Sequence, residues 1–206
     1  MPLFITFTGG LMERKIVGFV GPIAVGKGAA IEVFTAAGYV AYSLSDRVRE
    51  EARRRVALGK LRADYDRPDL QNIGNELRAT EGGATLAKRT WALVQGDGTL
   101  LVAIDSIRNP EEIHFLRALP GWKLLVGVTA SQWRRYQNMI GRARATDPKR
   151  WKEFLAVEER DRGAGESALG QQVDACLALA DVPIENEGTL FQFQGAIRQL
   201  MHEHGL

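Results

Sequence analysis

Cysteine is nearly absent from this chain of 206 residues: Cys176 stands alone, which excludes an internal disulfide bond. A free thiol is typical of a reducing compartment, so we expect a cytoplasmic protein. The neighbours Val173, Leu177 and Leu179 are apolar and indicate a packed thiol rather than a nucleophile. No apolar run approaches the roughly 20 residues that a membrane-spanning helix needs, and we therefore expect no membrane contact.

The amino terminus lacks basic residues in its first ten positions, which argues against a secretory signal peptide. Met12 directly precedes a charged triplet and the first apolar run. We interpret residues 1–11 as an upstream extension or a frayed arm, and we place residues 1–13 outside the predicted domain.

An excess of charge is also missing, because 27 basic residues face 25 acidic ones and leave a net charge of +2. A long contact with nucleic acid would need several more cations, so nucleic acid is a disfavoured partner. Hydrophobic residues make up 45% of the chain and charged residues 25%, as in an ordinary soluble domain. The length suits one well-buried domain, acting as a monomer or a homodimer.

A glycine-rich motif stands out against this ordinary background: residues 21–27 read Gly-Pro-Ile-Ala-Val-Gly-Lys. An apolar run precedes it and apolar residues at helical spacing follow it, so the motif is predicted to join a strand to a helix. Backbone N–H groups at such a turn bind phosphate, and a lysine there reaches the outer phosphates of a nucleoside triphosphate. The predicted phosphate-binding residues are Gly21, Ile23, Ala24, Val25, Gly26, Lys27, Gly28 and Ala29.

The motif departs from its usual form after Lys27, where a serine or threonine would contribute a hydroxyl ligand to Mg²⁺. Gly28 and Ala29 follow instead. The metal would then be held through water, phosphate oxygens and a carboxylate from another part of the chain. The alternative is a loop that binds nucleotide and turns it over poorly.

Strands and helices are predicted to alternate, which indicates an α/β fold with a parallel sheet covered on both faces. The predicted strands lie near 15–20, 39–43, 99–105, 123–129 and 182–185. The predicted helices cover 27–37, 45–58, 69–80, 83–95, 110–118, 131–140, 148–160, 167–179 and 189–203. Two stretches stand outside the minimal strand and helix core: residues 45–98, and residues 131–162 with their seven arginines.

Two segments are predicted to bring polar side chains to the carboxyl end of the sheet, where ligands of such folds bind. The first holds Asp46 and Arg49, which are either a helix cap with a solvated arginine or a phosphate-binding pair. The second holds Asp105 and Arg108, after the third strand. Asp105 either caps the helix that begins at Pro110 or anchors Mg²⁺ through water, because an acid at the tip of a buried strand beside a phosphate loop is the usual place for such an aspartate. Without a hydroxyl at position 28, Asp105 carries more of that role.

The arginines of 131–162 form either a charged hairpin paired with nearby acids or a flap that closes over phosphates and excludes water. Charge stabilisation by arginine suits phosphoryl transfer, and Arg142 and Arg144 are the favoured candidates. A turn with Asn186, Gly188 and Thr189 follows the last strand and is predicted to line the adenine, although such residues also favour turns in general.

Taken together, these residues resemble the P-loop nucleoside monophosphate kinase superfamily. Ser43 to Arg49 resembles the S-T-G-D-x-x-R segment of adenylate kinases, and Asp105 to Arg108 resembles their D-G-x-x-R turn. Most of residues 14–200 is more similar to the dephospho-CoA-kinase-like family, to which phage-type deoxynucleoside monophosphate kinases are also similar. The blocks that carry this likeness are 45–51, 71–78, 87–89, 104–112, 141–144, 147–148, 158–161 and 180–181.

The resemblance implies a three-layer P-loop NTPase fold with a central five-stranded parallel sheet. It further implies a core of residues 14–44, 99–130 and 163–206, a helical acceptor-binding insert at 45–98 and an arginine-rich lid at 131–162. ATP and Mg²⁺ are the implied cofactors. Lys27, Asp105, Arg142 and Arg144 would be catalytic. The implied acceptor-binding residues are Asp46, Arg49, Gln71, Asn75, Arg78, Arg89 and Arg108.

The leading hypothesis is an ATP-dependent kinase that acts on a nucleotide, a deoxynucleoside monophosphate above all. One alternative keeps the fold and changes the acceptor to dephospho-CoA or to a modified base in DNA. Another is a nucleotide-binding sensor with little turnover, which the missing hydroxyl at position 28 favours.

Overall fold

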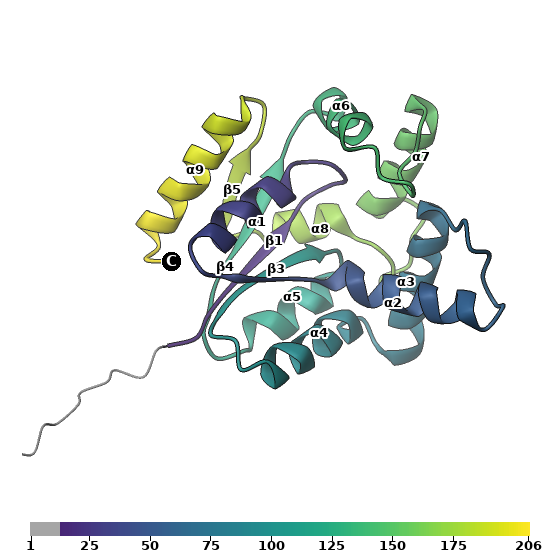
Figure 1. Cartoon of the computed structure of the whole chain (residues 1–206), viewed down its shortest axis with the longest axis horizontal. Coiled ribbons are helices and arrows are strands. Elements are labelled where there is room, and N and C mark those ends of the chain that lie inside the picture. Colours follow the sequence, from purple (N-terminus) through teal and green to yellow (C-terminus); the bar gives the residue numbers. More distant parts are fainter. Residues whose placement is uncertain (1–12) are drawn as a thin grey trace, which may run out of the picture.

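Five parallel strands, each close to its predicted position, form the centre of the computed structural model, which describes residues 13–206 (Figure 1). They are β1 (Lys15–Val20), β2 (Val40–Ser43), β3 (Leu101–Ile107), β4 (Trp122–Thr129) and β5 (Val182–Glu185). The strand order is β2-β3-β1-β4-β5, and every neighbouring pair is parallel. The predicted α/β fold with a five-stranded parallel sheet is confirmed. All but one residue of the predicted extension 1–13 lies outside the described residues.

The central strand β1 shows why the strands read as continuous apolar runs. Ile16 and Val20 point into the core on one face of the sheet, while Val17 and Phe19 point into the core on the other. A strand that is buried on both faces has no polar positions to alternate with apolar ones. The same strand leads directly into the phosphate loop, so the buried core fixes where that loop begins.

Helices cover both faces of the sheet (Figure 1). On one face, α1 (Lys27–Ala36) and α9 (Leu190–Glu203) pack side by side. The core of the other face takes side chains from α2 (Leu44–Ala57), α3 (Arg67–Glu81), α4 (Thr85–Gly96), α5 (Pro110–Arg117) and α8 (Val173–Ala178). The segment after β4 forms α6 (Gln132–Arg142) and α7 (Trp151–Arg162), and a smaller apolar cluster joins them to the phosphate loop.

The helices of the predicted insert and lid are present, and they face each other across one end of the sheet. Figure 1 shows α7 next to α3, and Gln71 Nε2 of α3 donates to Val157 O of α7 over 3.2 Å. Within residues 13–206 no helix is both long and apolar enough to cross a bilayer.

The predicted helix 167–179 is shorter than expected, since α8 begins only at Val173. Backbone groups of the preceding segment bond to the turn after β3 instead of to a helix. Asn109 Nδ2 donates to Ala168 O and Gly170 O at 2.9 and 2.8 Å, and the Gln172 N–H donates to Arg108 O at 2.7 Å. The irregular segment therefore stabilises the turn that carries Arg108.

Candidate functional site

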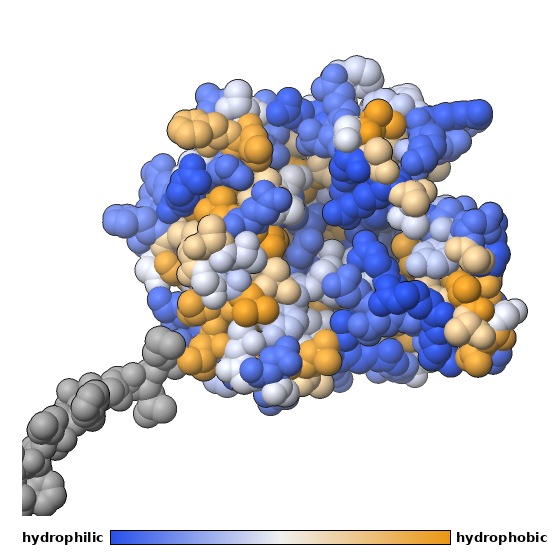
Figure 2. Space-filling view, in the orientation of Figure 1, coloured by the Kyte–Doolittle hydropathy of each residue, from blue (hydrophilic) through white to orange (hydrophobic). Residues whose placement is uncertain are grey.

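A cavity of about 320 Å³ lies at the carboxyl end of the sheet, between the phosphate loop, the tip of β3 and the segment 134–144. Figure 2 shows hydrophilic side chains gathered around the hollow between the α6–α7 layer and the α2–α3 layer. The cavity brings together most of the predicted residues: 23–29, Arg49, Asp105, Arg108, Arg142, Arg144 and Asn186. It also includes residues that were not predicted, namely Ser45, Arg67, Ser106, Arg134, Asn138 and Leu190.

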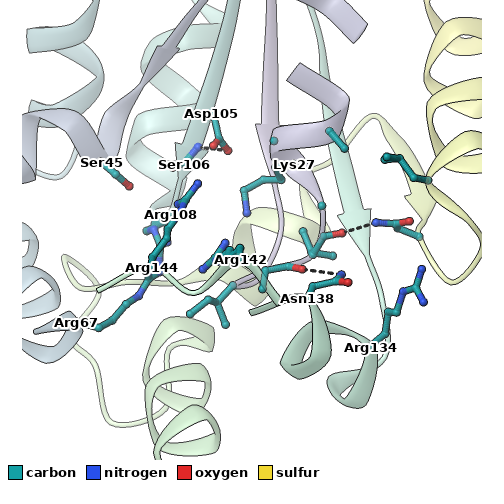
Figure 3. A pocket seen from close by; sticks show the side chains of 18 of the residues that line it. Lys27, Ser45, Arg67, Asp105, Ser106, Arg108, Arg134, Asn138, Arg142 and Arg144 are labelled. Atoms are coloured by element: carbon teal, nitrogen blue, oxygen red, sulfur yellow. Dashed lines mark hydrogen bonds between the residues drawn. The ribbon is translucent and has the colours of Figure 1, made fainter. Parts of the chain in front are cut away.

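The phosphate loop is held from outside by two asparagines, which leaves its N–H groups for a ligand. Asn186 Nδ2 donates to Val25 O at 2.8 Å, and Asn138 Nδ2 donates to Ala24 O at 3.1 Å (Figure 3). Gly26 has a φ of 105°, and a Cβ there would meet Asn186 Nδ2 at 2.2 Å. No side chain of the described residues caps α1, so its first turn is free to bind an anion.

Gly21 begins the loop but does not line the cavity. Its φ is 152°, and a Cβ there would lie 2.3 Å from Val128 O of β4. Glycine is needed at this position for close packing of the loop against the sheet. Its carbonyl has a second role, because it accepts a hydrogen bond from Lys27.

Lys27 lies in the centre of the cavity and donates through Nζ to Gly21 O at 2.6 Å and to Pro22 O at 3.1 Å. Burial lowers the pKa of Lys27 to about 8. The carboxylate of Asp105 opposes that shift, and the guanidinium of Arg108 adds to it. The negative charge of a bound polyphosphate would stabilise this buried ammonium group.

Asp105 and Ser106 sit in an irregularity at the tip of β3. The register between β1 and β3 shifts there, and Ser106 has a φ of 65°. An extra residue in one strand bends it and redirects its side chains. Here the Ser106 N–H donates to Asp105 Oδ1 at 2.5 Å, and both residues line the cavity.

The residues fit a magnesium ion held mainly by its substrate. No cluster of three or more potential metal-ligating side chains occurs within residues 13–206. Asp105 is the only acidic residue among the described residues that line the cavity. Gly28 offers no side-chain oxygen, although a Cβ at this position would meet nothing within 4 Å. Asp105 would therefore hold Mg²⁺ together with water and phosphate oxygens, as Mg²⁺ commonly requires.

Three arginines at the other end of the cavity are arranged by two buried aspartates. Arg108 Nη1 lies 2.6 Å from Asp161 Oδ2, and Arg67 Nη2 lies 3.5 Å from the same oxygen. Arg67 Nη1 lies 3.8 Å from Asp147 Oδ1, and Arg142 Nε donates to Asp147 Oδ2 at 2.7 Å. The result is a continuous chain of alternating charges that links the segment of α6 and α7, the start of α3 and the tip of β3.

Burial and charge act in opposite directions on this chain. Burial opposes the charge of Arg108, but Asp161 outweighs it and holds the pKa of Arg108 above its ordinary value. Burial likewise disfavours the Asp161 carboxylate, but Arg108 and Arg67 hold its pKa below the ordinary range. For Arg67, burial and the nearby Arg108 lower the pKa to about 10. Of the three groups, Arg67 has the least opposite charge nearby to offset its burial. A bound anionic ligand would therefore stabilise the charge of Arg67 most.

Two further arginines of the segment 131–162 reach the cavity from different directions (Figure 3). Arg144 is exposed, and burial of part of its side chain, together with Arg142, lowers its pKa. Arg134 lies at the opposite end of the cavity in Figure 3 and donates through Nη2 to Gly188 O at 2.6 Å. The cavity therefore has cations along its whole length.

A second cavity, of about 40 Å³, adjoins the first and shares Ser45, Arg49, Arg67, Ser106 and Arg108 with it. It also includes Gln71 and Arg78 from the predicted acceptor-binding residues. Arg78 is buried and forms an ion pair with Glu112 at 2.8 Å. Glu112 also accepts from the N–H groups of Arg108 and Asn109, so this pair stabilises the turn behind the cavity.

The remaining predicted residues line neither cavity. Asp46 is exposed and pairs with Arg49 at 3.1 Å, so it orients that arginine. Asn75 donates to Glu166, and Arg89 lies on the surface in an ion pair with Glu81. Gly188 contributes its carbonyl to Arg134, and Thr189 caps α9 by accepting from the Gln192 N–H at 3.2 Å.

Arg67 had a signal in the sequence that could have placed it. Asp66 and Pro68 flank it, and they are the residues expected at the cap and the first turn of a helix. That signal fixes Arg67 at the start of α3, close to the carboxyl end of the sheet. Its acidic neighbours Asp147 and Asp161 come from a distant segment, which no local pattern reveals.

Two comparisons with curated proteins cover nearly the whole chain. A UPF0200 protein of Thermococcus sibiricus is 32% identical over 198 residues, which cover 93% of this chain and 96% of the relative. A UPF0200 protein of Hyperthermus butylicus is 30% identical over 189 residues, which cover 92% of this chain and 94% of the relative. No protein-family model matches the sequence.

Solved structures resemble the fold at much lower sequence identity. A Thermus thermophilus protein has a TM-score of 0.56 and 19% identity, covering 93% of this chain and 98% of its own. A shikimate kinase from Bacteroides thetaiotaomicron has a TM-score of 0.51 and 10% identity, covering 93% of this chain and 99% of its own. These likenesses support the predicted P-loop kinase fold.

Proposed function

The chain belongs to the UPF0200 protein family, and we propose that it is an ATP-dependent kinase that phosphorylates a nucleotide, namely a nucleoside or deoxynucleoside monophosphate. One observation carries the proposal: the cavity has a phosphate loop with Lys27 at one side and the guanidinium groups of Arg49, Arg67 and Arg108 at the other. Two anionic groups can therefore bind within one cavity, with Asp105 on the wall between them.

The donor triphosphate is proposed to lie along the loop. The free N–H groups of α1 and the ammonium group of Lys27 would bind its phosphates. Arg134 and Leu190, which line the far end beside Asn186, would contact the base. Mg²⁺ bound beside Asp105 supplies compensation for the negative charge of the phosphates.

The acceptor is proposed to bind through a phosphate that it already carries. Arg49, Arg67 and Arg108 line both cavities, so they mark the junction between the transferred group and the acceptor. Forked guanidinium groups match the geometry of a phosphate better than that of an uncharged sugar. Arg142 and Arg144 would stabilise the charge that spreads over the phosphoryl group during transfer.

The resemblance to the dephospho-CoA-kinase-like family motivates a second acceptor, dephospho-CoA or a modified base in DNA. The sensor hypothesis rests on Gly28, which removes one ligand of Mg²⁺. Against it, the lid arginines and Asp105 share one cavity with Lys27, an arrangement that a binding module does not need.

The proposal is tested by ADP formation from ATP and Mg²⁺ with a panel of acceptors: nucleosides, their monophosphates and dephospho-CoA. We expect at least one monophosphate to accelerate ADP formation, and Lys27→Ala to abolish the acceleration. A panel in which dephospho-CoA alone is active would favour the second acceptor. Triphosphate binding with no turnover on any acceptor would favour the sensor.

A further inference from the structure

Two buried glutamines line the smaller cavity, and each has one polar atom without a hydrogen-bond partner among the described residues. Gln71 of α3 is 5% exposed, and Gln171, before α8, is 3% exposed. The atoms without partners are Gln71 Oε1 and Gln171 Nε2. An unpaired polar atom inside a protein is unfavourable, because it has given up its hydrogen bonds to water. Two of them around one cavity indicate a ligand that pairs with both.

The orientation of each amide is fixed by its neighbours. Gln71 Nε2 donates to Asp161 Oδ1 at 2.5 Å and to Val157 O at 3.2 Å, and neither partner can donate in return. Gln171 Oε1 accepts from Arg108 Nη1 at 2.8 Å, and a guanidinium group can only donate. Rotating the Gln71 amide by 180° would place its oxygen against two acceptors, and rotating the Gln171 amide would place its N–H group against a donor. The cavity thus presents a fixed acceptor from Gln71 and a fixed donor from Gln171.

The rest of the lining suits a flat, weakly polar group. Apart from the two glutamines, from the five residues that it shares with the larger cavity, and from Arg78, which is paired with Glu112, the remaining lining is Val48, Leu70, Gly74 and Leu86. This part of the wall is apolar. A saturated sugar presents several hydroxyl groups and would leave most of them without partners against these walls. An aromatic heterocycle has apolar faces and polar atoms only at its edge.

We propose that the smaller cavity reads the edge of a heterocyclic base on the acceptor. An N–H group of the base donates to Gln71 Oε1, and a ring nitrogen or carbonyl oxygen accepts from Gln171 Nε2. This inference rests on the proposed function in one respect, since Arg49 and Arg108 hold the acceptor's phosphate at the shared wall.

The same residues connect base recognition to phosphate recognition. Asp161 accepts from Gln71 through one oxygen and pairs with Arg108 through the other, and Arg108 donates to Gln171. Both amides are therefore positioned by the ion pair that places the phosphate-binding guanidinium. An acceptor that carries both a phosphate and a base would pair with Arg108 and with both glutamines, whereas a phosphate alone would pair only with the arginine.

The test is calorimetric binding to the full chain of UMP, CMP, AMP and GMP, with ribose 5-phosphate as the probe that has a phosphate but no base. We expect at least one nucleotide to bind roughly 10-fold more tightly than ribose 5-phosphate. Gln71→Met and Gln171→Met should remove most of that preference and leave ribose 5-phosphate within about 2-fold of the wild type. Gln95→Met, at an exposed position on α4, is the matched control and should change neither.

Thermal unfolding of each variant checks the fold. If Gln71→Met unfolds because Asp161 loses a donor, Gln171→Met alone carries the test, since that variant retains the ion pair between Arg108 and Asp161. Equal affinity of the wild type for ribose 5-phosphate and all four nucleotides would overturn the inference. So would variants that weaken ribose 5-phosphate and the nucleotides to the same degree.

The outcome is separable from that of the kinase proposal, because binding needs no turnover. A base preference that both glutamine variants abolish, without ADP formation from ATP, would support the base site and refute the kinase. Turnover of a monophosphate without any base preference would support the kinase and refute the base site.

Discussion

Arg108, at the tip of the sheet, lies 2.6 Å from the buried carboxylate of Asp161 on α7. This contact places a residue of α7 behind the residues that are proposed to bind the acceptor. Gln71 of α3 donates to the other oxygen of the same carboxylate. Asp161 therefore connects α7 to two side chains at the proposed acceptor end of the cavity.

Replacing the carboxylate tests how much this contact stabilises the fold. Asp161→Asn should lower the free energy of unfolding by about 3–5 kcal/mol, because it leaves buried guanidinium groups without their anion. Asp174→Asn breaks an exposed pair with Arg162 and should change stability by less than about 1 kcal/mol. Urea unfolding of both variants measures the difference. Equal stability of the two variants would show that Asp161 is not needed to hold the arginines.

The same aspartate should make stability depend on acid. Arg108 and Arg67 outweigh burial and lower its folded-state pKa, so the stabilisation is complete above the ordinary carboxyl pKa and is lost as the pH falls through the lowered value. Unfolding free energies measured between about pH 6 and pH 2 should fall more steeply in the wild type than in Asp161→Asn. Parallel curves would assign the acid sensitivity to other carboxylates.

Lys27 should make triphosphate binding depend on alkaline pH. Burial lowers its pKa to about 8, so the charge that binds phosphate is lost in the free protein as the pH rises above that value. For stability the sign is opposite: the buried charge is unfavourable below about pH 8, and this penalty disappears as the pH rises toward the ordinary lysine value.

The binding experiment uses a non-hydrolysable ATP analogue from about pH 7 to pH 9.5. Affinity should decline above pH 8 in the wild type. In Lys27→Met it should be at least ~10-fold weaker at neutral pH and nearly independent of pH. Lys123→Met removes a surface lysine that pairs with Glu13 and should behave as the wild type. A wild-type profile in Lys27→Met would refute the phosphate-loop assignment.

The metal requirement should depend on Asp105. Asp105→Asn is expected to raise the Mg²⁺ concentration for half-maximal activity at least ~10-fold while the fold remains intact. Gly28→Ser should lower that concentration or leave it unchanged, because the added side chain has open space and supplies a hydroxyl. Activity titrated with Mg²⁺ measures both. Wild-type metal dependence in Asp105→Asn would mean that another carboxylate is the anchor.

Arg67 and Arg89 make a matched pair for the acceptor site. Arg67 is buried at the junction of the two cavities, whereas Arg89 is exposed and paired with Glu81. Arg67→Ala and Arg49→Ala should raise the acceptor's apparent KM at least ~10-fold and affect the KM for ATP less. Arg89→Ala should stay within about 2-fold of the wild type. Similar effects of all three substitutions would place the acceptor elsewhere.

The sequence was sufficient for the sheet and for the phosphate loop because their signals are local. Strands such as β1 and β4 are buried on both faces and appear as uninterrupted apolar runs. The loop is specified by glycines that lie within a few residues of Lys27. Asp105 and Arg108 were found for the same reason, since each follows directly from the end of a recognisable strand.

Other features depend on partners far away in the chain, and no local pattern contains them. Arg67 is positioned by Asp147 and Asp161, and Gln171 by Arg108. The segment before α8 has a helical pattern, but its backbone bonds to Asn109 instead. Arg89 lies on the exposed face of α4 in an ion pair with Glu81, whereas Leu86 of the same helix lines the smaller cavity, and only the packing of α4 decides which face meets the cavity.

In the proposed reaction, a phosphoryl group passes from ATP to an acceptor that already carries a phosphate. The most direct measurement is transfer of label from ATP labelled at its γ-phosphate to nucleosides and to their matching monophosphates, with Mg²⁺ present. We expect labelled diphosphate product from at least one monophosphate, at a rate at least ~10-fold above that of its nucleoside. Label that appears only in inorganic phosphate, or equal labelling of nucleoside and monophosphate, would contradict it.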